Sequence, residues 1–215
     1  MNAPEPLTTV HLVRHGEVYN PEGVLYERLP GYHLSELGLA MAQRVADYFS
    51  RVLASQVGYL VASPLERAQE TAVPIGAALG LEVATDARLI EAGSSFAGTV
   101  VDAAHLVRPK ALVQLRNPRK PSWGEPYIEI AQRMTAAIAE ARVKVPGGHV
   151  VAVSHQSPIW RARLYAEGRP LWHFPTGRLC SLASITSLVF GAESGVLQAV
   201  RYYEPAGDLL PDHLR

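Results

Sequence analysis

The tripeptide Arg14-His15-Gly16 places two groups capable of phosphoryl chemistry directly after the apolar run of residues 10–13. Such a run is typical of a buried strand, and in open α/β sheets ligands bind in the crevice outside the carboxyl ends of the strands. A histidine there can act as a base or a nucleophile, and an arginine can hold a phosphate or a carboxylate through two parallel hydrogen bonds. The tripeptide therefore predicts a site for an anionic substrate.

Two further apolar runs, residues 59–62 and 150–153, are also followed by polar side chains. Arg67 lies in the first turn of the helix expected after the first run, and His155 follows the second run closely. If these strands are parallel neighbours, their carboxyl ends meet at one edge of the sheet. Glu91, which comes directly before an irregular segment, could reach the same edge.

A phosphomonoester explains this combination of two histidines, two arginines and a carboxyl group. Arg14 and Arg67 would hold the dianion, since a pair of unit charges about 4 Å apart gains roughly 4 kcal/mol at an effective dielectric near 20. General acid catalysis contributes only about 10²- to 10⁴-fold, which is too little for a reaction as slow as phosphomonoester hydrolysis. We therefore expect His15 to attack phosphorus. Glu91 would give a proton to the leaving alkoxide, provided that burial or the dianion raises its pKa.

Strands and helices alternate along the chain, and this order predicts the fold. The expected strands cover residues 10–13, 59–62, 81–85, 150–153, 182–190 and 196–203, and the expected helices cover residues 35–53, 65–79, 125–141 and 158–165. Ser35 is the expected N-cap of the first helix, and Pro74 is expected to kink or interrupt the second. The pattern predicts an α/β fold, a three-layer α/β/α sandwich whose mostly parallel sheet gains an antiparallel edge strand from the closing hairpin.

The pattern loosens between residues 93 and 124, where prolines and basic residues interrupt it. We expect this segment to be a small cap insertion within a single domain that covers residues 1–215. The basic run of residues 116–120 is interpreted as a solvated face, with attraction of an acidic substrate as the alternative.

The bulk composition is that of an ordinary globular protein, with 48% hydrophobic residues in a chain of 215. With 20 basic and 20 acidic side chains, the formal net charge is zero, which argues against general binding of nucleic acid. Cys180 is the only cysteine, so no intramolecular disulfide is expected and a cytoplasmic location is favoured. We expect no signal peptide and no membrane segment. The expected partner is a small phosphorylated substrate, and a homodimer stays open.

Taken together, these segments resemble the histidine phosphatase superfamily, which includes the cofactor-dependent phosphoglycerate mutases. The segments that carry the resemblance are residues 12–17 (LVRHGE) with Asn20, residues 62–72 (ASPLERAQETA) and residues 153–155 (VSH), supported by residues 31–38 (GYHLSELG) and 123–125 (WGE). The resemblance extends from about residue 9 to residue 203. Each motif alone is weak, whereas the three in this order are highly specific.

The resemblance implies an α/β phosphoglycerate mutase-like fold and a role for each matching residue. His15 would be the phosphorylated nucleophile, Arg14, Arg67 and His155 would complete the phosphate pocket, Glu91 would be the proton donor, and Asn20 would contact the phosphate or the substrate. The cap would lie over the pocket and select the substrate. No metal ion and no cofactor would be needed for hydrolysis.

The chain departs from the family after the proposed acid, where Phe96-Ala97-Gly98 replaces the Trp-Glu-Gly of many relatives. Asp86 is the alternative acid. Two other functions stay open. One is a cofactor-dependent phosphoglycerate mutase, although such mutases tend to have a longer insertion, and the other is a catalytically silent sensor of phosphorylated ligands.

Several residues also have simpler interpretations. Asn20 could be only a turn residue before a proline, and Tyr26 and Arg28 could either help to close the pocket or lie on a solvated loop. His11 and His15, four residues apart on a strand, could instead ligate a metal, which the neighbouring arginines disfavour.

Overall fold

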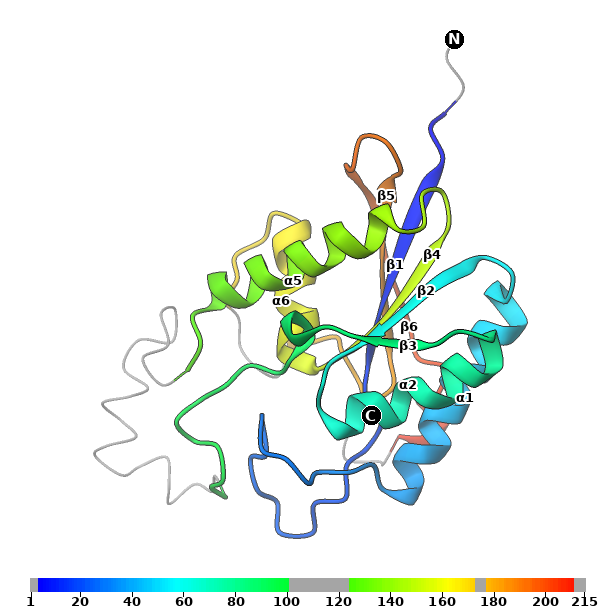
Figure 1. Cartoon of the computed structure of the whole chain (residues 1–215). Helices are drawn as coiled ribbons and strands as arrows, with labels where there is room; N and C mark the ends of the chain where they lie inside the picture. The colour runs from blue at the N-terminus through cyan, green and yellow to red at the C-terminus, as the bar shows by residue number, and fades with distance from the viewer. Residues whose placement is uncertain (1–3, 101–123, 173–176, 211–215) are drawn as a thin grey trace.

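The computed structural model describes residues 4–100, 124–172 and 177–210. Its centre is a six-stranded sheet in the order β3-β2-β4-β1-β5-β6 (Figure 1). The strands are β1 (Leu7–Arg14), β2 (Val57–Ala62), β3 (Val83–Thr85), β4 (His149–Ser154), β5 (Ile185–Gly191) and β6 (Leu197–Tyr203). The helices are α1 (Glu36–Leu53), α2 (Glu66–Leu79), α5 (Tyr127–Val143) and α6 (Gln156–Ala166), with short 3₁₀ turns η1 (Ala87–Leu89) and η3 (Gly207–Leu209).

The sheet is mostly parallel, which confirms the predicted α/β class. Strands β1 to β4 run in one direction, with β4 between β1 and β2. Strand β5 is antiparallel to both of its neighbours, β1 and β6. The antiparallel strand contributed by the closing hairpin is therefore β5, and the edge strand β6 runs in the same direction as β1.

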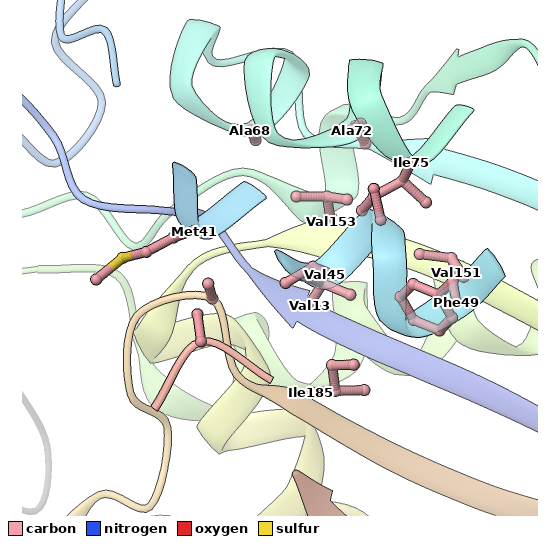
Figure 2. Packing of buried hydrophobic residues seen from close by; sticks show 14 of the residues in the cluster. Val13, Met41, Val45, Phe49, Ala68, Ala72, Ile75, Val151, Val153 and Ile185 are labelled. Carbon is pink, nitrogen blue, oxygen red and sulfur yellow. The ribbon is translucent and has the colours of Figure 1, made fainter. Parts of the chain in front are cut away.

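Helices cover both faces of this sheet because alternate residues of each strand point to opposite sides. Val13 and Val153 pack with Phe49 of α1 and Ile75 of α2 in one buried cluster (Figure 2). Leu12, Val10 and Val150 of the same strands belong to a second cluster with α5 and α6 (Figure 1). Burying a side chain of this size contributes about 1.5–3 kcal/mol, so the two clusters fix the strands that carry the site.

The element boundaries follow from local chemistry. Ser35 caps α1 as predicted, since its Oγ accepts a hydrogen bond from the Gly38 amide (2.9 Å). Strand β3 starts later than predicted because Gly80, at φ 68°, caps α2 and the Leu81 amide still bonds to that helix. Helix α2 continues through Pro74, so of the two predicted effects, a kink or an interruption, the interruption is wrong. Packing of the helix on both sides of the proline keeps it continuous.

The loop after β1 lies tightly against the first turn of α1. A Cβ atom at Gly38 would lie 2.0 Å from the Glu17 carbonyl oxygen, and one at Gly16 would lie 2.5 Å from the Gly38 carbonyl oxygen. Only glycine fits at these two positions, so the chain can bring the helix start beside the Arg14-His15-Gly16 loop.

Most of the predicted cap, residues 101–123, lies outside the described residues, and so does the basic run of residues 116–120. Within the described part of the chain, no helix combines the length and the apolar character needed to span a bilayer.

Candidate active site

The carboxyl ends of three neighbouring strands meet at one edge of the sheet. Arg14 of β1 pairs in register with Ser154 of β4. The pairing continues beyond the strands, since the His15 amide donates to the Ser154 carbonyl (3.1 Å) and the Ser63 amide donates to the Val153 carbonyl (2.9 Å). The structure therefore places the three segments side by side, as the sequence predicts.

The imidazole of His15 is buried, and its hydrogen bond defines its tautomer. Nδ1 lies 2.7 Å from the Gly16 carbonyl oxygen, which can only accept, so Nδ1 carries the proton and Nε2 the lone pair. Burial, followed by the charges of Arg14 and Arg67, holds the pKa of His15 well below its ordinary value. The imidazole is therefore neutral near pH 7, and its Nε2 has nucleophilic character.

His155 lies beside His15, with the two ring centroids 5.1 Å apart. Its Nε2 is 2.7 Å from the hydroxyl of Ser63, and among the described residues its buried Nδ1 has no hydrogen-bond partner. Burial, followed by the neighbouring His15, holds the pKa of His155 well below its usual range. When the Ser63 hydroxyl donates to Nε2, the remaining proton sits on Nδ1 and can be donated to a ligand.

Arg14 and Arg67 bring two guanidinium groups to the same edge. Arg14 donates from Nη1 to the Cys180 carbonyl (2.7 Å), and the fully buried Arg67 donates from Nη2 to the Glu27 carbonyl (2.5 Å). The Arg67 guanidinium also lies 4.7 Å from the centroid of the Tyr26 ring. In the described part of the chain, Nε of Arg14 and both Nε and Nη1 of Arg67 are buried without a partner.

Arg67 is buried and Arg14 is half-buried, yet neither has the carboxylate that usually accompanies such a cation. The ion pairs formed among the described residues involve neither Arg14 nor Arg67. Buried charges are costly unless they are paired, and unpaired buried N–H groups add to that cost. The arrangement is therefore complementary to an anion with several acceptor oxygens, such as a phosphoryl group.

Glu91 supplies a carboxyl group with a different environment. Its Oε1 accepts a hydrogen bond from the Ala92 amide (2.7 Å). Burial of the carboxyl raises its pKa above the ordinary value, although the Ala92 hydrogen bond and the charges of Arg67 and Arg14 oppose this shift. Glu91 therefore holds a proton to higher pH than an exposed glutamate does, which suits a proton donor.

The loop after β1 forms one wall of this region. The side-chain amide of Asn20 makes two hydrogen bonds with the Val24 backbone (2.9 and 3.1 Å), which supports its interpretation as a turn residue. Tyr26 covers Arg67 and stacks on Tyr32, with centroids 5.0 Å apart, and Arg28 donates to the Glu91 carbonyl (2.7 Å). Tyr26 and Arg28 thus contact the site, while Asn20 shapes the loop.

Two alternatives from the sequence do not fit this geometry. His11 bonds to Ser187 and His149 (2.8 Å each), and no group of three ligating side chains gathers among the described residues. Asp86 is held by the Arg88 guanidinium, with contacts of 2.6–3.1 Å, which lowers the pKa of its carboxyl and so disfavours a role as proton donor.

The structure also brings residues to the site that the sequence did not single out for a role. Ser63 orients His155, Arg133 donates to the Glu91 carbonyl, and Glu125 accepts from Arg133. Ser63 and Glu125 both belong to the motifs that carry the family resemblance, so the sequence did contain a signal for their involvement in the site. Arg133 lies on a predicted helix, where an arginine is ordinarily solvated.

Comparisons with known proteins agree with the fold. The family model of the histidine phosphatase superfamily (branch 1) matches residues 10–202. The chain is 52% identical over 202 residues to the uncharacterized protein Rv0525 of Mycobacterium tuberculosis, with 93% of this chain and 97% of the relative covered. It is 28% identical over 207 residues to an Escherichia fergusonii protein named "Probable phosphoglycerate mutase GpmB", with 93% of each covered.

Among solved structures, the mycobacterial glucosyl-3-phosphoglycerate phosphatase Rv2419c is similar in fold. The TM-score is 0.73 and the sequence identity is 26%, with 91% of this chain and 97% of that chain covered.

Proposed function

Because the chain belongs to branch 1 of the histidine phosphatase superfamily, we propose that it hydrolyses small phosphomonoesters through a phosphohistidine intermediate, without a metal ion. One observation carries this proposal. The neutral imidazole of His15 lies beside the half-buried Arg14 and the buried Arg67, which pair with no carboxylate of the described residues. The nucleophile and the groups that bind the anion therefore lie together at the same edge of the sheet.

In the first step, Nε2 of His15 attacks phosphorus and the ester P–O bond breaks. Glu91, protonated at that moment, gives its proton to the leaving oxygen, so the product alcohol departs neutral. Arg14 and Arg67 donate to the non-bridging oxygens, where negative charge is held throughout the transfer. The hydrogen bond from Nδ1 of His15 to the Gly16 carbonyl stabilises the imidazolium character that develops on the ring.

In the second step, water attacks the phosphohistidine. The Glu91 carboxylate takes a proton from that water, the P–N bond breaks, and inorganic phosphate is released. His15 returns to its neutral form and Glu91 to its protonated form, so the cycle balances. His155 donates from Nδ1 to the phosphoryl group in both steps, with Ser63 holding its other nitrogen.

The alternative is a phosphoglycerate mutase, in which the phosphohistidine returns its phosphoryl group to the substrate. The relative named as a mutase motivates this alternative, and the phosphatase Rv2419c among the similar structures favours hydrolysis. Incubation with phosphoglycerate separates the two activities, because a mutase gives the isomer and a phosphatase gives inorganic phosphate.

Trapping the intermediate tests the proposal directly. The wild-type protein, incubated with a ³²P-labelled phosphomonoester in the presence of a chelator, should acquire an acid-labile label on His15, and His15→Ala should acquire none. Full activity of His15→Ala in chelator would overturn the proposal. Tight binding of phosphoesters without turnover at any pH would instead favour the sensor.

Two further parts of the proposal concern context. We propose that the chain forms a single domain, in which the insertion of residues 93–124 acts as a cap over the phosphate pocket and selects the substrate. The protein works in the cytoplasm, where its single thiol stays reduced, and burial of Cys180 raises the pKa of that thiol to about 11.

A further inference from the structure

The backbone of the proposed acid is held by a cluster of charged side chains from distant parts of the chain. The Glu91 carbonyl accepts hydrogen bonds from Nε of Arg28 (2.7 Å) and Nη2 of Arg133 (3.4 Å). Arg28 belongs to the loop after β1, and Arg133 belongs to α5. Both guanidinium groups meet on one carboxylate, that of Glu125.

We infer that Glu125 is a positioning residue for the proton donor Glu91, acting through the Arg28 and Arg133 guanidinium groups that it holds together. This inference rests on the proposed function and extends it. Glu125 does not itself reach the reacting atoms, so it is not a catalytic residue. We call Arg28, Glu125 and Arg133 the carboxylate clamp.

The geometry of the carboxylate clamp uses both oxygens of Glu125. Oε2 accepts from Nη2 of Arg28 (2.6 Å) and from Nη2 of Arg133 (3.0 Å), while Oε1 accepts from Nε of Arg133 (2.8 Å). Nη1 of Arg133 donates to the carbonyl of Arg88 (2.5 Å), which lies within the η1 turn before Glu91. Each guanidinium therefore binds the carboxylate on one side and the backbone around Glu91 on the other.

The backbone reinforces the same arrangement. The Glu125 amide donates to the Gly93 carbonyl (2.9 Å), and Ser94 forms an isolated antiparallel bridge with Gly124. A Cβ atom at Gly93 would lie 3.3 Å from the Arg28 guanidinium, so a small residue there lets Arg28 approach closely. Glu125 is thus tied to the segment that follows the acid by main chain as well as by side chain.

Burial makes this carboxylate important for the placement of both arginines. The side chains of Glu125 and Arg133 are each only 16% exposed, whereas that of Arg28 is 41% exposed. Removing the carboxylate leaves the largely buried charge of Arg133 uncompensated and facing that of the more exposed Arg28, which is unfavourable. The guanidinium groups then separate, and the Glu91 carbonyl loses its donors.

A shift of the acid has a specific kinetic consequence. A displacement of about 1 Å of a positioned group can cost roughly 10²-fold in rate. The cost applies only where the leaving group needs the proton. An alkoxide leaves poorly without one, whereas a nitrophenolate leaves readily as an anion. Damage to the carboxylate clamp should therefore depend on the leaving group, and general damage to the fold or the phosphate pocket should not.

The test compares kcat/KM of the full chain for glycerol phosphate and for p-nitrophenyl phosphate. Glu125→Ala should lower the value for glycerol phosphate by about 10²-fold and that for p-nitrophenyl phosphate by less than about 3-fold. Glu125→Gln, which keeps the shape of the side chain, should show the same selectivity with a smaller loss. Glu167→Ala is the matched control, because Glu167 also binds two arginines and is 19% exposed but lies at the end of α6. It should leave both values unchanged.

A double-mutant cycle with Glu91→Gln makes the test decisive. If Glu125 acts only through Glu91, the combined variant should be no slower on glycerol phosphate than Glu91→Gln alone. Equal losses of Glu125→Ala on both substrates, or losses that add to those of Glu91→Gln, overturn the inference. Wild-type protein that turns over neither substrate and takes no label on His15 contradicts the proposed function itself.

Discussion

Arg67→Met should lower activity while leaving the unliganded fold as stable as before, or more stable. Arg67 is fully buried, and among the described residues its Nε and Nη1 have no partner. Methionine fills a similar volume without a charge. The substitution thus separates the cost of an unpaired buried cation in the free protein from its benefit in the phosphate complex.

The stability change follows from the contacts of Arg67. Methionine loses the hydrogen bond to the Glu27 carbonyl, worth about 1.5–3 kcal/mol, and the cation–π contact with Tyr26, worth about 1–2 kcal/mol. It removes two buried nitrogens without partners, Nε and Nη1, which cost about 1–3 kcal/mol each, together with the desolvation of the charge. We expect the free energy of unfolding to change by between zero and about +2 kcal/mol, or by up to roughly 8 °C in melting temperature.

The activity change has the opposite sign. A guanidinium about 4 Å from a phosphoryl charge gains roughly 4 kcal/mol at an effective dielectric near 20, which corresponds to about 10³-fold in kcat/KM. Inorganic phosphate at about 100 times its dissociation constant should stabilise the wild-type protein by about 2.7 kcal/mol and should stabilise Arg67→Met far less.

Thermal unfolding with and without phosphate, together with kcat/KM for p-nitrophenyl phosphate, measures both changes. Arg67→Lys serves as the control that keeps the charge but not the planar fork, and it should recover part of the activity. The reasoning is refuted if Arg67→Met loses more than about 2 kcal/mol of stability, or if phosphate stabilises it as much as it stabilises the wild-type protein.

Three further predictions concern protonation and support. Activity on alkyl phosphates should fall at low pH as His15 takes up a proton, and this fall should come at a lower pH than for an ordinary histidine because the pKa of His15 is lowered. Activity should also fall at high pH as Glu91 loses its proton. A pH–rate profile of Glu91→Gln that keeps the alkaline fall would contradict the assignment of Glu91 as the proton donor. Ser63→Ala should lower kcat by about 10- to 10²-fold with an unchanged melting temperature, because His155 loses the partner that selects its tautomer. Burial lowers the pKa of His11 to about 3, so the unfolded state binds the proton first and stability should fall as the pH drops from about 6.5 toward 3. Urea titrations at a series of pH values should show that the free energy of unfolding of His11→Asn falls less steeply as the pH drops. An unchanged dependence on pH would argue that other groups dominate the acid destabilisation.

The sequence predicts the fold well where apolar periodicity decides it. Leu12 and Val13 lie in a run that is buried on both faces, and the structure places them in opposite clusters with helices on each side. The predictions miss where a single interaction decides a boundary. Leu81 is apolar and was expected in a strand, but the left-handed Gly80 keeps its amide bonded to the preceding helix.

The phosphate-binding part of the site is equally accessible from sequence, because its residues follow strand ends. His15 and His155 come directly after parallel neighbours, so the sheet alone brings them together. Asn20 stands beside the same motif, yet its amide is used by Val24. Proximity along the chain indicates which side chains reach the site, but the hydrogen bonds that each one already makes decide its role.

The support of the acid could not have been predicted in the same way, for a physical reason. Glu91 follows no strand of the sheet, and its carbonyl is held by Arg28 and Arg133, which lie 63 and 42 residues away in the chain. These contacts are polar, partly exposed and aperiodic, so neither hydrophobic patterning nor a strand-end rule signals them. The sheet holds the nucleophile in place, whereas side chains hold the acid, so the two groups respond differently to substitutions. Substitutions that loosen the carboxylate clamp can therefore change which leaving groups are accepted while leaving the phosphate pocket intact.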